Sequence, residues 1–377
     1  MMAASRNQRS EQDPLIELSG VSKTFINAAG SFEALKNISV TFQRGEFVGV
    51  IGKSGSGKST LANMISGIDH PTRGKVFVEG LDIHAMKESD QARWRGKNMG
   101  VVFQFFQLLP MLTLVENVLL PMDFCDVYQP EDRIDRAMYL LELVGLADDA
   151  HKLPGSVSGG QQQSAAIARA LANDPPIIIA DEPTGNLDAK TADAVYDKFE
   201  NLSGEGRTII MITHDPEIEH RLSRKILLFD GEMIAPILVR TLPWLLRPDL
   251  RELGHRLEFH TYARGDELDM TGNLSDQLVL VEKGEIDLLF KKKRKEKAVA
   301  VSSNAFFAGS DIVNKEKLKR FSARVTSESA RVAILPWAEV GKALDSIHDG
   351  HERFQKYLRN FMMGDSKAVD EVTGVIE

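Results

Sequence analysis

The chain is poor in cysteine, in long apolar runs and in positive charge, and each shortage excludes a class of protein. Its 377 residues contain one cysteine, Cys125, so neither an internal disulfide nor a thiolate zinc site can form. No apolar run reaches the roughly 18 residues of a membrane-spanning helix, and the opening MMAASRNQRSEQDP lacks the apolar stretch of a secretory signal. The sequence therefore predicts a cytoplasmic protein with at most a peripheral role on the inner face of the cell membrane.

Acidic residues outnumber basic ones, 54 to 46, and the formal net charge at pH 7 is −8. An extended nucleic-acid surface needs the opposite balance, because Lys and Arg neutralise phosphates. The composition is otherwise that of a globular protein, with 43% hydrophobic and 27% charged residues. The charge balance therefore argues against a nucleic-acid partner. A chain of this length exceeds what one hydrophobic core usually supports, so we expect two domains.

The first domain is predicted to occupy residues 15–236, after a flexible N-terminus at residues 1–14. LIELSGVSKTF and FEALKNISVTF alternate as short strands do, and GEFVGVIG is a strand that ends at glycines before a helical pattern. PPIIIADE and RTIIMITHD have the apolar character of buried parallel strands, whose carboxyl ends face a ligand crevice. A mainly helical insert, roughly residues 111–172, lies between these two runs and the first strand. These patterns predict an α/β fold.

The second domain is predicted at residues 237–365, with a C-terminal tail at residues 366–377. A Leu-rich stretch with prolines follows the boundary near Pro236 and indicates leading helices. From about Leu257 short alternating segments are separated by Gly, Asn and charged clusters, which is typical of antiparallel strands. We expect a small β domain with flanking helices.

The run GKSGSGKST, beginning at Gly52, matches the phosphate-binding pattern G-x-x-x-x-G-K-[ST]. Glycines let backbone N–H groups converge on phosphate oxygens, and the N-terminus of the following helix adds its dipole. The lysine can reach the β- and γ-phosphates of ATP, and the serine can offer a hydroxyl to Mg²⁺. A merely flexible glycine loop would not need a strand before it and a helix after it. The candidate ATP ligands here are Gly52, Ser54, Gly55, Gly57, Lys58, Ser59 and Thr60.

Two carboxylates, Asp181 and Glu182, end the apolar strand IIIA. We expect Asp181 to hold Mg²⁺ together with Ser59, and Glu182 to polarise the water that attacks ATP. An acidic pair at a strand end can also be merely solvated. The combination with the glycine-rich loop favours the catalytic interpretation.

Four further motifs give the chain its resemblance to the ABC ATPases. VSGGQQQ, starting at Val157, resembles the signature motif of that family, Gln104 its Q-loop, GNLD ending at Asp188 its D-loop, and His214 its switch histidine. The resemblance covers roughly residues 15–235. It implies that Gln104 and His214 serve catalysis, with Gln104 also reaching the metal, and that Phe25 stacks on adenine.

The resemblance further implies a head-to-tail homodimer. In it Ser158, Gly159, Gly160 and Gln161 of one subunit would bind the γ-phosphate of ATP held by the other. A serine followed by two glycines before a helix is also, on physical grounds, a cap and an anion site. Ser164 and Val157 depart from the common Arg and Leu of the family, and because neither is a phosphate ligand, hydrolysis is expected to survive.

Within that family, MLTLVENVLLPM and NAAGSFEALKN resemble the lipoprotein-release and macrolide-exporter class. The resemblance implies integral-membrane permease partners that dock on residues 104–114; a Leu-rich helical core is the alternative interpretation. Repair-type members need a long coiled coil and translation-type members two ATPase units, and the sequence has neither. A nucleotide-gated regulator or scaffold that is not coupled to transport remains the second hypothesis.

Residues 240–363 begin with predicted helices and continue with FHTYARGDELDMTGNLSDQLVLVEKGEIDLLF in place of opening strands. This pattern resembles that of the cyclic-nucleotide-binding domains, which implies a jelly-roll fold, but the ligand cassette departs from theirs. Phe307, Ala308 and Gly309 stand where that family has Phe-Gly-Glu, and Phe321 stands where it has the phosphate-binding Arg. We therefore expect a regulatory or docking module that does not bind a cyclic nucleotide. The basic run at residues 291–297 is either a solvated hairpin tip or a site for anionic lipid head groups.

Overall fold

The computed structural model describes residues 13–28, 30–185, 187–214, 218, 220–270, 272–292, 295–309, 321–352 and 354. The chain divides into two compact units, Met1–Met233 and Ile234–Glu377. The boundary expected near Pro236 falls just after this division. Most of the predicted N-terminal segment and the whole predicted C-terminal tail lie outside the described residues.

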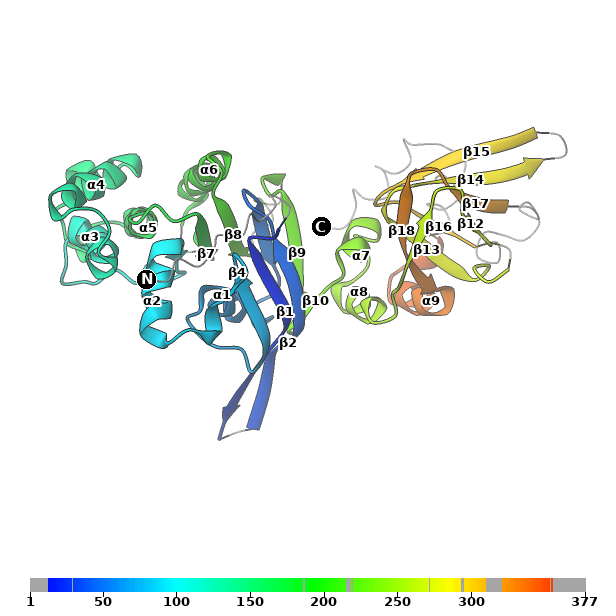
Figure 1. Ribbon diagram of the computed structural model, residues 1–377, viewed down its shortest axis with the longest axis horizontal. Coiled ribbons are helices and arrows are strands. Elements are labelled where there is room, and N and C mark those ends of the chain that lie inside the picture. Colours follow the sequence, from blue (N-terminus) through cyan, green and yellow to red (C-terminus); the bar gives the residue numbers. More distant parts are fainter. Residues whose placement is uncertain are drawn as a thin grey trace, which may run out of the picture. The chain divides into compact units, whose positions relative to one another are not determined.

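The first unit contains two sheets (Figure 1). The antiparallel sheet has the order β2-β1-β4-β5 and consists of β1 (Ile16–Asn27), β2 (Gly30–Phe42), β4 (Arg73–Val78) and β5 (Leu81–Asp82). The second sheet has the order β10-β9-β3-β8-β7-β6 and consists of β3 (Phe47–Ile51), β6 (Met99–Val102), β7 (Ile177–Asp181), β8 (Thr208–Thr213), β9 (Arg224–Phe229) and β10 (Glu232–Met233). Only β10 runs antiparallel to its neighbour in this second sheet.

The helices of the first unit pack around the second sheet. They are α1 (Lys58–Ser66), α2 (Glu88–Asn98), α3 (Leu114–Cys125), α4 (Pro130–Leu143), α5 (Gly159–Ala170) and α6 (Ala189–Gly204), with short 3-10 turns at Ile83–Ala85, Ala147–Asp149 and Pro154–Ser156. α3, α4 and α5 form the helical insert that the sequence predicts. Among the described helices, none has both the length and the apolar character needed to cross a membrane.

The parallel strands are covered on both faces, which explains their uninterrupted apolar sequences. One core combines side chains of this sheet with α3, α4, α5 and α6. A second core lies between the sheet, α1 and the antiparallel sheet. The carboxyl ends of β3, β7 and β8 therefore meet at one edge, where the glycine-rich loop, Glu182 and His214 follow them in the sequence.

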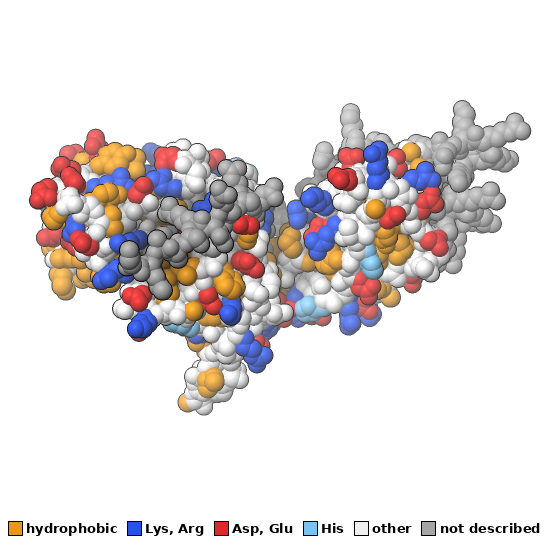
Figure 2. Space-filling model, viewed as in Figure 1, with side chains coloured by type: hydrophobic (Ala, Val, Ile, Leu, Met, Phe, Trp, Pro, Cys, Tyr) orange, Lys and Arg blue, Asp and Glu red, His pale blue; other side chains and the backbone are white. Residues whose placement is uncertain are grey.

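The two N-terminal strands are longer than the short strands that the sequence suggests. Pairing of β1 with β4 ends at Ser22 and Arg73, whereas pairing with β2 continues to Asn27 and Gly30. The additional residues form a two-stranded hairpin that projects beyond the sheet (Figure 1). Figure 2 shows hydrophobic side chains at the tip of this projection.

The second unit begins with α7 (Pro236–Thr241) and α8 (Arg247–Gly254) and later contains α9 (Trp337–Asp345). Its strands form two four-stranded antiparallel sheets, β11-β18-β13-β16 and β12-β17-β14-β15. The strands are β11 (Glu258–Ala263), β12 (Glu267–Leu268), β13 (Gln277–Lys283), β14 (Glu285–Lys292), β15 (Lys295–Ser302), β16 (Phe306–Ala308), β17 (Phe321–Val325) and β18 (Ser329–Pro336). Side chains of both sheets share one core. The predicted leading helices and antiparallel strands are confirmed.

Candidate functional site

The glycine-rich loop between β3 and α1 owes its shape to three glycines. Gly55 and Gly57 have φ angles of +79° and +101°, which L-residues rarely adopt. At Gly52 a Cβ would overlap the carbonyl oxygen of Leu228 and approach Ser56 Oγ. The loop therefore closes tightly and leads directly into the N-terminus of α1, whose first N–H groups have no helical acceptor.

Lys58, the first residue of α1, directs its side chain back into this loop. Its Nζ donates hydrogen bonds to the carbonyl oxygens of Gly52, at 2.9 Å, and Lys53, at 3.1 Å. Although the side chain is almost fully buried, the ammonium group is satisfied by these carbonyls and lies 3.8 Å from Glu182 Oε1. A positive charge is thus held inside the loop, next to the N-terminus of α1, which is an arrangement suited to a polyphosphate.

A cavity of about 280 Å³ opens beside the loop. Nine of the predicted site residues line it: Phe25, Ser54, Gly55, Gly57, Lys58, Ser59, Thr60, Gln104 and Glu182. The lining also includes Phe32 and Ala34, which sequence reasoning missed. Phe32 lies directly opposite Phe25 in the β1–β2 register, and this register depends on where the hairpin turns.

Glu182 follows β7 with a φ of +45°, a strained value for a non-glycine residue. Its N–H is fixed by the carbonyl of Ile212, at 2.8 Å. Its carboxylate accepts a hydrogen bond from Gln104 Nε2 at 3.0 Å and lies 3.2 Å from His214 Nδ1. The structure therefore brings together at one carboxylate the two other predicted catalytic side chains and Lys58.

Asp181, the last residue of β7, is held in a less polar environment. Burial raises the pKa of its carboxyl group, the hydrogen bond with Ser59 lowers it, and repulsion by Glu182 raises it again, with a net upward shift. Its Oδ1 is buried and has no hydrogen-bond partner. A buried carboxylate oxygen left unpaired beside a serine hydroxyl is a donor set that suits a hard divalent cation such as Mg²⁺.

The signature residues begin α5. Ser158 is its N-cap: the side chain accepts from Gln161 N at 3.2 Å, and Gln161 Oε1 accepts from Ser158 N at 2.9 Å. This reciprocal capping occupies the N–H groups of Ser158 and Gln161, and it leaves those of Gly159 and Gly160, which have no acceptor within the helix, to an anion. Val157 packs partly buried against the neighbouring core, and Ser164 is buried in α5, so neither departure from the family pattern alters this turn.

Asp188 is the N-cap of α6, and its carboxylate accepts from Thr191 N at 3.1 Å and from Thr191 Oγ1 at 2.6 Å. These hydrogen bonds hold the pKa of Asp188 below its usual value. A Cβ at Gly160 would lie 2.9 Å from Thr191 Cγ2, so the signature and the D-loop are neighbours. Among the described residues that line the cavity, however, none belongs to either motif.

Arg169 links the end of the signature helix to the segment after Gln104. Its guanidinium donates to the carbonyl oxygens of Gln107, at 2.5 Å, and Phe106, at 2.8 Å, and both of those residues have positive φ angles. Burial lowers the pKa of Arg169. Sequence reasoning did not identify this residue as part of the site, since its partners lie more than sixty residues earlier in the chain.

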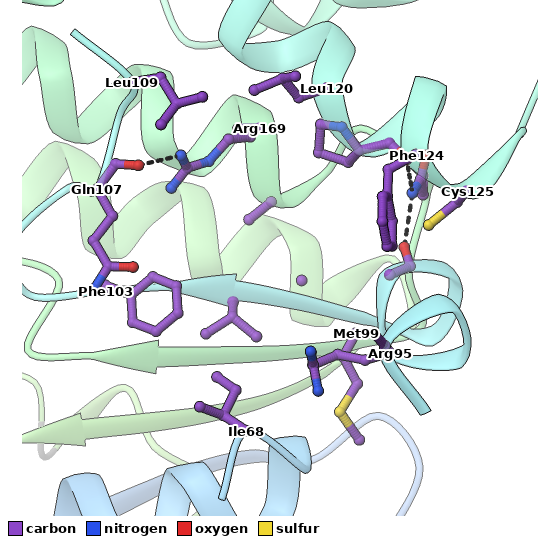
Figure 3. Close-up of a pocket in the computed structure, with 17 residues that line it drawn as sticks. Ile68, Arg95, Met99, Phe103, Gln107, Leu109, Leu120, Phe124, Cys125 and Arg169 are labelled. Atoms are coloured by element: carbon purple, nitrogen blue, oxygen red, sulfur yellow. Dashed lines mark hydrogen bonds between the residues drawn. The ribbon is translucent and has the colours of Figure 1, made fainter. Parts of the chain in front are cut away.

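A second, larger hollow of about 530 Å³ lies between α2, α3, α5 and β6 (Figure 3). Gln107 and Leu109, from the predicted docking segment, form part of its lining. Leu120 and Phe124 of α3 line it as well. Phe124 and Leu109 are 64% and 43% exposed, so the hollow has an apolar, open rim. We call it the α3 groove.

Taken with the fold, these contacts define a P-loop nucleoside triphosphatase, in which a polyphosphate site and a positioned carboxylate meet at the edge of a parallel sheet. Residues 35–185 match the ABC transporter family. The chain is 44% identical over 220 residues to the uncharacterised ABC transporter ATP-binding protein YknY of Bacillus subtilis, covering 58% of this chain and 95% of that protein.

It is also 46% identical over 208 residues to the lipoprotein-releasing system ATP-binding protein LolD 1 of Chlorobium chlorochromatii, covering 55% of this chain and 85% of that protein. A solved dimeric, post-hydrolysis structure of the ATP-binding cassette MJ0796 with ADP and Pi is 40% identical, with a TM-score of 0.56, and covers 58% of this chain and 97% of that one. This chain belongs to the family of ABC transporter ATP-binding proteins. It is an ATPase and the ATP-binding subunit of an ABC transport system.

Proposed function

We propose that the chain hydrolyses MgATP with Glu182 as the residue that polarises the attacking water. The observation that carries this assignment is the convergence of Gln104, His214 and Lys58 on the Glu182 carboxylate. Bound polyphosphate would compete for Lys58, which releases the carboxylate to face a water molecule. Gln104 and His214 then orient that carboxylate toward the γ-phosphate.

Mg²⁺ would be held by Asp181 and Ser59, with Gln104 as a third ligand. The unpaired Asp181 Oδ1 and its neighbouring hydroxyl support this assignment. When bound, the ion neutralises charge on the phosphate oxygens.

We further propose that two copies close head to tail around two ATP molecules. The helix N-termini of α5 and α6 carry Ser158, Gly159, Gly160, Gln161 and Asp188, and none of these five is among the described residues that line the nucleotide cavity of their own chain. A second copy would bring them to the γ-phosphate. The relative MJ0796 has been solved as a dimer with ADP and Pi, which supports this arrangement.

The partner for the α3 groove is, by this proposal, an integral-membrane permease that holds the subunit at the inner face of the membrane. The groove is apolar at its rim and is attached through Arg169 to both Gln107 and the signature helix. Docking there would change the positions of Gln104, through the segment that follows it, and of Ser158, through the signature helix. LolD 1 is named for a lipoprotein-releasing system, and this chain is proposed to serve a system of that class.

Replacing Leu109 by Asp is expected to abolish co-purification with a multi-span membrane protein and any stimulation of ATPase activity in membranes. A charge on the rim would have to be desolvated on docking. Leu143→Asp is the matched control, since Leu143 is a leucine of similar exposure, 51%, on α4 and outside the groove. If Leu109→Asp stayed bound and fully stimulated, the groove would not be the docking surface. ATPase activity that no permease affects would favour the regulator or scaffold hypothesis.

For the second unit we propose a jelly-roll-like regulatory or docking module that does not bind a cyclic nucleotide. Its paired antiparallel sheets and leading helices are compatible with that fold. At Gly309, where the resembling family has its ribose-binding Glu, any Cβ would overlap the carbonyl oxygens of Leu274 and Ser275. The carboxylate position is therefore closed. The side chain of Phe321 and all of Arg320 lie outside the described residues.

Isothermal titration of the full chain with cAMP and cGMP is expected to give no binding below millimolar concentration. Loss of the Arg–phosphate pair alone costs about tenfold to a hundredfold in affinity, and a missing ribose carboxylate adds to it. MgATP in the same instrument is the positive control. Micromolar binding of either cyclic nucleotide would make the unit a sensor.

The basic run at residues 291–297 spans the turn between β14 and β15, which pair up to Lys292 and Lys295. Its side chains lie outside the described residues. We propose a solvated hairpin tip, and flotation of the full chain with anionic liposomes, compared with a charge-neutralised variant, tests the lipid alternative.

A further inference from the structure

The β1–β2 hairpin contributes two aromatic rings to the nucleotide cavity. Phe25 and Phe32 are directly opposite in the register, so their side chains lie on one face of the hairpin with their Cβ atoms about 5 Å apart. Both rings are substantially exposed, at 42% and 56%, and both line the cavity with the phosphate-binding loop. A pair of exposed rings beside a polyphosphate site forms an apolar platform for a planar base.

The ring of Phe25 is covered on one side by a fixed cation. Lys23 Nζ lies over it, 4.9 Å from the ring centroid, within the distance of a cation–π contact. Lys23 itself is mostly buried and, among the described residues, is not part of the cavity lining. The ammonium therefore contacts the ring without lining the cavity.

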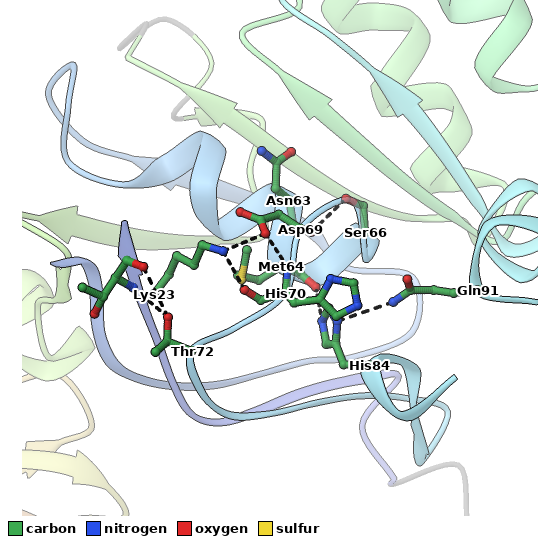
Figure 4. A network of polar contacts seen from close by, with 10 residues as sticks. Lys23, Asn63, Met64, Ser66, Asp69, His70, Thr72, His84 and Gln91 are labelled. Carbon is green, nitrogen blue, oxygen red and sulfur yellow. Dashed lines mark hydrogen bonds and ion pairs between the residues drawn. The ribbon is translucent and has the colours of Figure 1, made fainter. Parts of the chain in front are cut away.

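Lys23 is in turn anchored to the loop after α1 (Figure 4). Its Nζ donates to Asp69 Oδ1 at 2.7 Å and to the carbonyl oxygen of His70 at 2.9 Å. Burial opposes the charge on Asp69, but the hydrogen bonds from Lys23 and from the His70 N–H leave its pKa below the usual value. The lowered pKa keeps the Asp69 carboxylate ionised at neutral pH, where it can hold the Lys23 ammonium.

The Lys23–Asp69 pair also connects the two aromatic rings to the phosphate site. The N–H of Asp69 and the N–H of Ile68 both bond to the carbonyl oxygen of Asn63, in the last turns of α1. α1 begins at Lys58 and has nine residues, a length of about 14 Å. One short helix thus carries the polyphosphate loop at its N-terminus and the anchor of Lys23 just beyond its C-terminus.

We propose that Lys23, held by Asp69, is a positioning residue that orients the Phe25 ring for the nucleotide base, and that Phe32 supplies a second aromatic surface to that base. The proposal rests on the proposed nucleotide site. In this arrangement the base stacks on the cavity side of Phe25, and the ammonium contacts the same ring without lining the cavity. The contact of Lys23 with Phe25 does not affect the triphosphate contacts, since Lys58 and Ser59 make those from α1.

The test uses the full chain and two ligands, MgATP and the Mg²⁺ complex of 2-aminopurine riboside triphosphate, whose base fluorescence is quenched by stacking. Lys23→Met is expected to weaken MgATP binding by about twofold to fivefold and to restore part of the fluorescence of the bound analogue at saturation. Lys23→Arg should retain both affinity and quenching, because its guanidinium can replace the cation. Phe32→Ala is expected to cost roughly fivefold or more in affinity.

Ile26→Ala is the control, because Ile26 is on the same hairpin, 84% exposed, and not part of the cavity lining. It should match the parent chain in both measurements. The quenching at saturation reports the stacked geometry and not the stability of the fold, so a merely structural role of Lys23 would leave it unchanged. If Lys23→Met had the affinity and the quenching of the parent chain, Lys23 would not be a positioning residue for Phe25. A parent chain that neither binds MgATP nor quenches the analogue would instead overturn the nucleotide site itself.

Discussion

Replacing Glu182 by Gln is expected to lower the rate of ATP hydrolysis at least about a hundredfold while leaving ATP binding intact. The amide has the shape of the carboxylate, so Gln104 Nε2 keeps an acceptor at the same place. It lacks the basicity that polarises water, and a positioned general base typically contributes a hundredfold to ten-thousandfold. The variant should therefore bind MgATP without hydrolysing it.

Such a stalled chain should also accumulate as a dimer, because the bound γ-phosphate would remain between Lys58 of one copy and Ser158 of the other. Size-exclusion chromatography with light scattering, with and without MgATP, measures this. Glu142→Gln, at an exposed glutamate of α4, is the matched control and should behave as the parent chain. Hydrolysis at the parental rate in Glu182→Gln would show that another group activates the water. An inactive but monomeric variant would contradict the proposed closure.

The parts of this site that the sequence predicts are those in which neighbouring residues determine the geometry. The glycine-rich loop and the caps at Ser158 and Asp188 are short-range structures, since each donor and acceptor lies within a few residues of its partner. The two apolar strands before Glu182 and His214 place those residues at one sheet edge, because carboxyl ends of parallel strands meet there. Local sequence pattern and the rule for parallel strands were therefore sufficient to predict that these residues share a site.

The parts that the sequence does not predict depend on contacts between distant segments. Phe32 joins the site through the hairpin register, and Arg169 through carbonyl groups more than sixty residues away. The Lys23–Asp69 pair links a strand to the end of a helix across 46 residues. A lysine, an aspartate or an arginine in these places reads as an ordinary surface charge until tertiary structure brings its partner close.

Lys58→Ala is expected to abolish nucleotide binding, with a loss of affinity of at least about a hundredfold. In the structure the Lys58 ammonium donates hydrogen bonds to the carbonyl oxygens of Gly52 and Lys53 and offsets their partial negative charge. Without it, those two carbonyl oxygens and the Glu182 carboxylate would face the incoming polyphosphate with no positive charge between them. Each charge-assisted hydrogen bond lost contributes about 1.5–3 kcal/mol, and the exposed acceptors add repulsion.

Lys53→Ala separates this effect from a general loss of positive charge in the loop. Lys53 lies in the same loop between Gly52 and Ser54, but its side chain is exposed, and its contact with Lys58 is through the backbone carbonyl. Titration with MgATP should therefore find Lys53→Ala within about twofold of the parent chain and Lys58→Ala without measurable binding. Circular dichroism must show both variants folded, which is expected because α1 retains its packing through Leu61, Met64 and Ile65. Equal weakening by the two substitutions would mean that net charge, and not the placement of one ammonium inside the loop, determines affinity.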